Sequence, residues 1–134
     1  MAIIRDDIVQ VRTENDVVVA RQTVRRWAAD LGLGIVDQTK IVTAASELAR
    51  NTLSYGGGGT MRLEAVSEGT RKGLRLTFED RGPGIANLDL ALQDGYTTGG
   101  GLGLGLGGSR RLVSEFDIRS VVGEGTRVTI ARWK

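Results

Sequence analysis

The sequence contains no cysteine and no histidine, and these two absences remove several classes of chemistry. Without cysteine, the chain can form no disulfide and offers no thiolate to a metal. Without histidine, it lacks the base of Ser-His-Asp and Cys-His enzymes and the usual nitrogen ligand of zinc. It also cannot phosphorylate itself on histidine. Acid–base chemistry must therefore fall to carboxylates, lysine or tyrosine.

Aromatic residues are scarce, at 4% of the sequence, and the formal net charge is only +2. Few rings are available for bases to stack on, and so small a charge does not indicate nucleic-acid binding. No apolar run is long enough to span a membrane, and no N-terminal stretch resembles a signal peptide. We therefore expect a cytoplasmic protein with neither nucleic acid nor membrane as a partner.

Proline occurs once, whereas glycine occurs 20 times and is clustered at residues 56–59, 82–84 and 95–108. Scattered glycines would weaken a fold of this size, because each loses much backbone entropy on folding. Clustered glycines instead favour loops where the backbone approaches a ligand closely. Flexible loop tips are the alternative interpretation.

Residues 1–134 suit one domain, since no linker, repeat or charge block divides them. Apolar periodicity predicts strands and helices at 8–13, 15–31, 37–54, 61–65, 74–78, 88–92, 106–115, 118–121 and 127–131. Asn15 or Asp16 is expected to cap the first helix, and Asp37 the second. This order predicts an α+β fold: a two-layer α/β sandwich, with a mostly antiparallel mixed sheet covered on one face by helices.

Glu47 and Asn51 form the first candidate constellation, one turn apart on the second predicted helix. Both fall at the border of the apolar stripe, on the same side of the helix. The carboxylate could accept a proton from a hydroxyl, and the amide oxygen could ligate a hard cation such as Mg²⁺. The pair by itself is also compatible with a solvated helix face, which is the commoner case.

Asp80 ends a predicted strand and opens the segment Asp80-Arg81-Gly82-Pro83-Gly84-Ile85. Gly82 and Gly84 allow the backbone to approach a flat ligand closely. An ionised carboxylate accepts hydrogen bonds from an exocyclic amino group, such as that of adenine. A tight turn with a polar tip explains the segment equally well.

Residues 97–108 are a glycine-rich stretch that leads into the helix predicted at 106–115. Bare backbone N–H groups ahead of a helix can bind an anion, so a triphosphate fits here. The formal match Gly103-x-Gly105-x-x-Gly108 follows no buried strand, and no Walker-type loop is present. The candidate ligand contacts are Thr98, Gly99, Gly100, Gly101, Leu102, Gly103, Leu104 and Gly105.

Gly123-Glu124-Gly125-Thr126 precedes the last predicted strand. A hairpin turn accounts for these residues without any ligand. Thr126 gains a functional role only if it closes a pocket beside Asp80.

In this order and at these spacings, the four elements resemble those of the GHKL ATPases. That group comprises gyrase, Hsp90, histidine kinases and MutL, and it shares the Bergerat ATP-binding fold. Residues 47–51 resemble the N-box, 80–84 the first glycine box, 99–107 the second, and 125–126 the last adenine-side element. The resemblance implies ATP and Mg²⁺ as cofactors.

The resemblance also implies a role for each motif. Glu47 would be the general base for a substrate hydroxyl, and Asn51 would coordinate Mg²⁺. Asp80 would hold the adenine amino group, and Thr126 would add a hydroxyl near it. The base would lie over residues 82–85, which include Gly82, Gly84 and Ile85. Residues 99–107 would form a lid and phosphate cradle.

Within that group, the chain resembles the compact switch-protein kinases of bacterial partner-switching systems. This implies a serine/threonine kinase that phosphorylates STAS-domain antagonists of the stressosome. When released, it would activate a PP2C-type phosphatase or another output protein. An anti-sigma-factor binding module of the same fold is the main alternative. A stand-alone ATPase is disfavoured, because no second domain is expected that could couple hydrolysis to motion.

Overall fold

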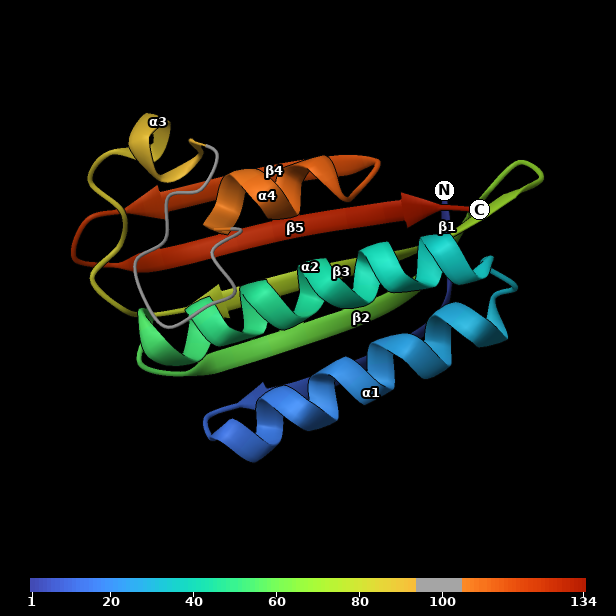
Figure 1. Ribbon diagram of the computed structural model, residues 1–134, viewed down its shortest axis with the longest axis horizontal. Helices are drawn as coiled ribbons and strands as arrows, with labels where there is room; N and C mark the ends of the chain where they lie inside the picture. The colour runs from blue at the N-terminus through green and yellow to red at the C-terminus, as the bar shows by residue number, and fades with distance from the viewer. Residues whose placement is uncertain (94–104) are drawn as a thin grey trace.

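A five-stranded sheet is the frame that positions the other elements (Figure 1). The computed structural model describes residues 1–93 and 105–134. The sheet has the order β1-β2-β3-β5-β4, and all four pairings are antiparallel. Helices cover one of its faces, so the predicted two-layer α+β architecture is confirmed. The elements are β1 (Ala2–Val11), α1 (Glu14–Asp30), α2 (Ile35–Ser54), β2 (Gly59–Glu68), β3 (Arg71–Asp80), α3 (Leu88–Ala91), α4 (Gly105–Arg111), β4 (Glu115–Val121) and β5 (Gly125–Trp133).

Helix α1 begins at Glu14 because Thr13 caps it. The Thr13 hydroxyl accepts a hydrogen bond from the Asp16 backbone N–H at 3.1 Å, and the Asp16 carboxylate accepts one from the Thr13 N–H at 3.2 Å. This reciprocal pair satisfies two backbone donors that the first turn leaves open. The prediction that Asn15 or Asp16 is the cap was therefore wrong, because Thr13 is the cap and Asp16 is the third residue of the helix.

Helix α2 begins at Ile35 with Gly34 as its cap, and Asp37 lies inside its first turn. The prediction that Asp37 caps the helix was wrong. Its carboxylate instead pairs with Arg132, near the C-terminal end of β5. Arg132 donates to Asp37 Oδ1 from Nε at 2.9 Å and from Nη2 at 2.6 Å. Its Nη1 donates to the Leu112 carbonyl at 3.0 Å. One side chain thus joins α2, β5 and the segment that follows α4.

The apolar stripe of α2 packs against the sheet as its periodicity predicted. Ile41, Ala45 and Leu48 are at most 1% exposed, and they belong to the same core as Leu63 and Leu76. Helices α1 and α4 both pack against α2 as well. Only a narrow strip of α2 therefore remains accessible to a ligand.

Strand β1 is longer than the predicted 8–13 and starts at Ala2. It pairs with β2 along its length, with one irregularity between Ile3 and Arg5. Residues 2–7 include two adjacent aspartates and show no clean alternation, so their own pattern gave no strand signal. Their extended conformation depends on backbone hydrogen bonds supplied by β2.

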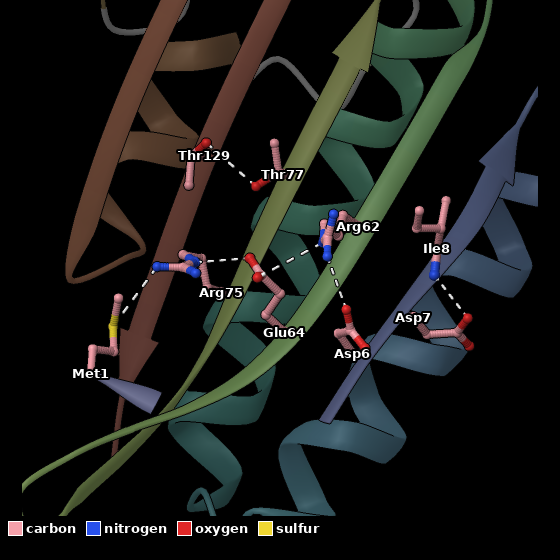
Figure 2. A network of polar contacts seen from close by, with 9 residues as sticks. All are labelled: Met1, Asp6, Asp7, Ile8, Arg62, Glu64, Arg75, Thr77 and Thr129. Atoms are coloured by element: carbon pink, nitrogen blue, oxygen red, sulfur yellow. Dashed lines mark hydrogen bonds and ion pairs between the residues drawn. The ribbon is translucent and has the colours of Figure 1, made fainter. Parts of the chain in front are cut away.

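The second sheet face is not covered by helices and carries polar side chains (Figure 2). Glu64 is 6% exposed and lies between two arginines, with Arg75 Nε 2.9 Å from its Oε1 and Arg62 Nε 3.8 Å from its Oε2. Arg62 also contacts Asp6 of β1 at 2.9 Å. Ladders of opposite charge across strands stabilise such a solvated face.

The short helix α3 lies where it was predicted, whereas α4 ends earlier than the predicted 106–115. The Ser114 N–H already donates to the Ala131 carbonyl of β5 at 2.8 Å, and Glu115 begins β4. Pairing with β5 therefore overrides the local helical pattern. Gly107 lets α4 approach the Leu92 backbone, since a Cβ at Gly107 would overlap the Leu92 carbonyl.

We expect Asp37→Ala to lower the free energy of unfolding by about 1–3 kcal/mol, because Arg132 would lose a charged hydrogen-bond acceptor. The side chains of this pair are 19% and 33% exposed, so solvent screens it only in part. Denaturant unfolding would measure the change. Asp117→Ala is the control, because the Asp117–Arg119 pair is 64% and 79% exposed and such pairs contribute about 0–1 kcal/mol. Equal losses in both variants would contradict this account.

Candidate nucleotide-binding site

A cavity of about 250 Å³ opens between α2, the end of β3, the start of β5 and the segment around α3. Its walls are largely apolar, and its polar groups come from a few side chains. This combination is typical of small-molecule sites. The lining residues are Leu48, Asn51, Thr52, Tyr55, Phe78, Asp80, Ile85, Ala86, Asn87, Leu90, Ala91, Leu106, Thr126 and Val128.

Asp80 lies at the end of β3, where two stretches of backbone come close together. A Cβ added to Gly82 would lie 2.7 Å from the Gly56 Cα, and a Cβ on Gly56 would overlap the Asp80 side chain. The Gly82 N–H donates to Asp80 Oδ1 at 2.9 Å. The two glycines thus provide the room in which the carboxylate is held.

Burial of the Asp80 carboxyl raises its pKa above the ordinary value of 3.8. Hydrogen bonds from the backbone N–H groups of Gly82 and Thr126 act in the opposite direction and are the smaller effects. The desolvated acceptor is poised for a hydrogen bond from a ligand. A water-exposed carboxylate would gain less from the same bond.

The peptide unit between Gly84 and Ile85 is held at both of its polar atoms. The Tyr55 hydroxyl donates to the Gly84 carbonyl at 2.8 Å, and the Ile85 N–H donates to Ser120 Oγ at 2.7 Å. Gly84 has a φ of +75°, and a Cβ there would overlap the Val121 carbonyl. Glycine is therefore required at position 84 for both conformation and space.

Asn51 and Asp80 line the same cavity, which the sequence interpretation required. Glu47 lies one turn before Asn51 on α2 but is not among the lining residues. It is 2% exposed, so the prediction that it sits at the border of the apolar stripe underestimated its burial.

The other predicted site residues divide into four groups. Thr126 and Ile85 line the cavity, whereas Gly82 and Gly84 do not and instead permit close backbone packing. Gly105 is the first residue of α4. Thr98, Gly99, Gly100, Gly101, Leu102, Gly103 and Leu104 lie outside the described residues, so their assignment stays a prediction.

Sequence reasoning missed two polar contributors to this site. Tyr55 follows Asn51 by one helical turn, so the same periodicity that places Asn51 could have identified it. Ser120 gave no such signal, because it lies in a strand with no motif around it. Its contacts with Ile85 and Thr126 arise only when β4 pairs with β5.

The profile of the histidine kinase-, DNA gyrase B- and HSP90-like ATPase family matches residues 36–134. The chain belongs to this ATPase family. The match includes α2, β3 and β5, which contribute to the cavity wall, and membership in an ATPase family implies ATP binding.

Curated relatives of two kinds resemble the chain over most of its length. It is 48% identical to the serine/threonine-protein kinase RsbT of Bacillus subtilis over 125 residues, which cover 93% of this chain and 94% of that protein. It is 33% identical to an anti-sigma F factor of Geobacillus thermodenitrificans, covering 90% of this chain and 86% of the relative. Within the ATPase family, the chain is therefore an RsbT-like serine/threonine kinase.

Solved structures agree on the fold. A crystal structure of the RsbU and RsbW domains of a Mycobacterium tuberculosis protein superposes with a TM-score of 0.67 at 23% identity. The overlap covers 96% of this chain but only 32% of that chain. The mycobacterial sensor histidine kinase MprB superposes with a TM-score of 0.57 at 20% identity, covering 96% and 97% of the two chains. These likenesses support the ATPase-family architecture and nothing finer.

None of the described helices combines the length and apolar character that crossing a membrane requires.

We expect the change in stability caused by Asp80→Asn to be more favourable at neutral pH than at acid pH. The folded-state pKa of Asp80 is raised, so its ionisation opposes folding, and its contribution to stability falls as pH rises from about 3.8 through the folded pKa. Asparagine does not titrate but can still accept from the Gly82 N–H. Thermal unfolding should show a difference in Tm, variant minus wild type, that is more positive near pH 7 than near pH 3. A constant or opposite difference would contradict the burial argument.

Proposed function

We propose that this chain is a serine/threonine protein kinase that transfers the γ-phosphate of ATP to STAS-domain antagonist proteins of a stressosome partner-switching system. The observation that carries the proposal is the convergence of Asn51 and Asp80 on one cavity, in a chain 48% identical to a serine/threonine kinase. When released from these antagonists, the chain would activate a downstream output protein such as a PP2C-type phosphatase.

The described residues fit an adenine base. Phe78, Ile85 and Val128 provide apolar walls, and the Asp80 carboxylate provides an acceptor at one edge. An ionised carboxylate accepts from the 6-amino group of adenine and repels the 6-oxo group of guanine. The cavity should therefore prefer ATP to GTP.

Asn51 is the candidate ligand for a cation bound with the nucleotide. Its side chain lies at the cavity wall, and an amide oxygen suits Mg²⁺, which prefers oxygen ligands. A bound Mg²⁺ would neutralise charge on the phosphates. No cluster of three or more acidic side chains that could hold a metal by itself occurs among residues 1–93 and 105–134. We infer that the phosphates supply most of the remaining ligands.

Glu47 is the candidate general base. It lies one turn from Asn51, and side chains at this spacing have Cβ atoms about 5–6 Å apart. Glu47 is 2% exposed and therefore lies away from bulk water. In this role, Glu47 would accept the proton of the substrate serine or threonine hydroxyl as the phosphoryl group arrives.

An anti-sigma-factor binding module is the second candidate. The specific observation in its favour is that relatives 32% and 33% identical to this chain are anti-sigma F factors. The same cavity would then bind ATP while the protein surface holds a sigma factor. Fold alone does not separate the two functions.

We expect the chain, mixed with labelled ATP, Mg²⁺ and a cognate STAS-domain protein, to label that protein on serine or threonine. Glu47→Gln should lower the transfer rate about 100-fold or more, because general-base catalysis contributes that much. ATP affinity should change little, since Glu47 does not line the cavity.

Glu64→Gln is the matched control, because Glu64 is also a buried carboxylate but lies on the opposite sheet face (Figure 2). It should label the partner at the wild-type rate. Absence of label with the wild-type chain, together with tight ATP-dependent binding to a sigma factor, would favour the anti-sigma function. An unchanged rate in Glu47→Gln would remove Glu47 as the base.

A further inference from the structure

Ser120 links two segments of the cavity wall that are distant from each other in sequence, the one at Ile85 and the start of β5. Its Oγ lies 2.7 Å from the Ile85 backbone nitrogen, 2.8 Å from Thr126 Oγ1 and 3.2 Å from the Gly125 carbonyl oxygen. Ser120 does not itself line the cavity, whereas Ile85 and Thr126 do. The hydroxyl therefore acts on any ligand through its neighbours.

The Ile85 N–H can only donate, so Ser120 Oγ accepts this bond. A serine hydroxyl has one proton to donate and two lone pairs that accept. The proton and the second lone pair of Ser120 serve its contacts with the Gly125 carbonyl and the Thr126 hydroxyl, and the Ser120–Thr126 bond can run in either direction.

Thr126 is the β-ladder partner of Asp80, so the two side chains line the cavity at the same level. The contact with Ser120 restrains the Thr126 hydroxyl at this level. The Asp80 carboxylate accepts hydrogen bonds, so this edge of the cavity matches an amino group and disfavours a carbonyl oxygen.

We propose that Ser120 is a positioning residue for base selection, which restrains the Thr126 hydroxyl beside Asp80 and holds the Ile85 amide in place. This proposal rests on the proposed ATP-binding function. Tyr55 supports the same peptide from the other side, through its bond to the Gly84 carbonyl at 2.8 Å. Ser120 therefore completes the alignment of the segment that carries Ile85.

The test is to measure dissociation constants for MgATP and MgGTP with the wild type, Ser120→Ala and Ser120→Thr. Without the Ser120 hydroxyl, the Thr126 side chain loses this contact and the Ile85 N–H loses its acceptor. We expect Ser120→Ala to weaken ATP binding about tenfold, the equivalent of one hydrogen bond, and GTP binding much less, so that the ATP/GTP preference falls. Ser120→Thr keeps a hydroxyl and should restore most of the preference.

Thr129→Val is the matched control. It removes a hydroxyl from the same sheet, where Thr129 Oγ1 lies 3.5 Å from Thr77 Oγ1 on the uncovered face (Figure 2). It should leave the ATP/GTP preference unchanged. If Ser120→Ala keeps the wild-type preference, or if Thr129→Val lowers it equally, the proposal is wrong. A wild-type chain that binds neither nucleotide would instead contradict the proposed function itself.

Discussion

The site depends on the close approach of two backbone segments at Gly56 and Gly82, around the Asp80 side chain. Neither glycine could carry a Cβ without overlapping the other segment or the carboxylate. This contact brings the loop after α2 against the end of β3 and holds the carboxylate half-buried. The raised pKa of Asp80 reflects the desolvation that results. The fold thus tolerates a destabilising acid at this position, as binding sites often do.

Contacts at both ends of α2 hold the helix against the sheet. The Arg132–Asp37 pair ties the first turn of α2 to the end of β5. At the other end of the helix, the Tyr55 hydroxyl binds the Gly84 carbonyl. Because both ends of α2 are held, the position of Asn51 is fixed relative to Asp80, which lines the same cavity. Preorganisation of this kind reduces the cost of ordering a site when a ligand binds.

A kinase and an anti-sigma factor could share this design if the cavity serves the nucleotide and not the partner, as in the proposed function. Under that proposal, Glu47 would carry the chemistry of phosphoryl transfer. It is also a buried residue of the fold. Relatives of both functional kinds align with this chain over more than four fifths of its length.

By itself, the sequence determined the α2 stripe, the position of Asn51 and the placement of Asp80 at a strand end. These features follow from local geometry, since helical and strand periodicities depend only on near neighbours in the chain. The tertiary structure alone decided the burial of Glu47, the pairing of Asp37 with Arg132, the extent of β1, the early end of α4 and the contacts of Ser120. Each of these depends on a group distant in sequence. A polar side chain can form a hydrogen bond only with groups that packing has brought within hydrogen-bond distance, and local sequence does not specify those groups.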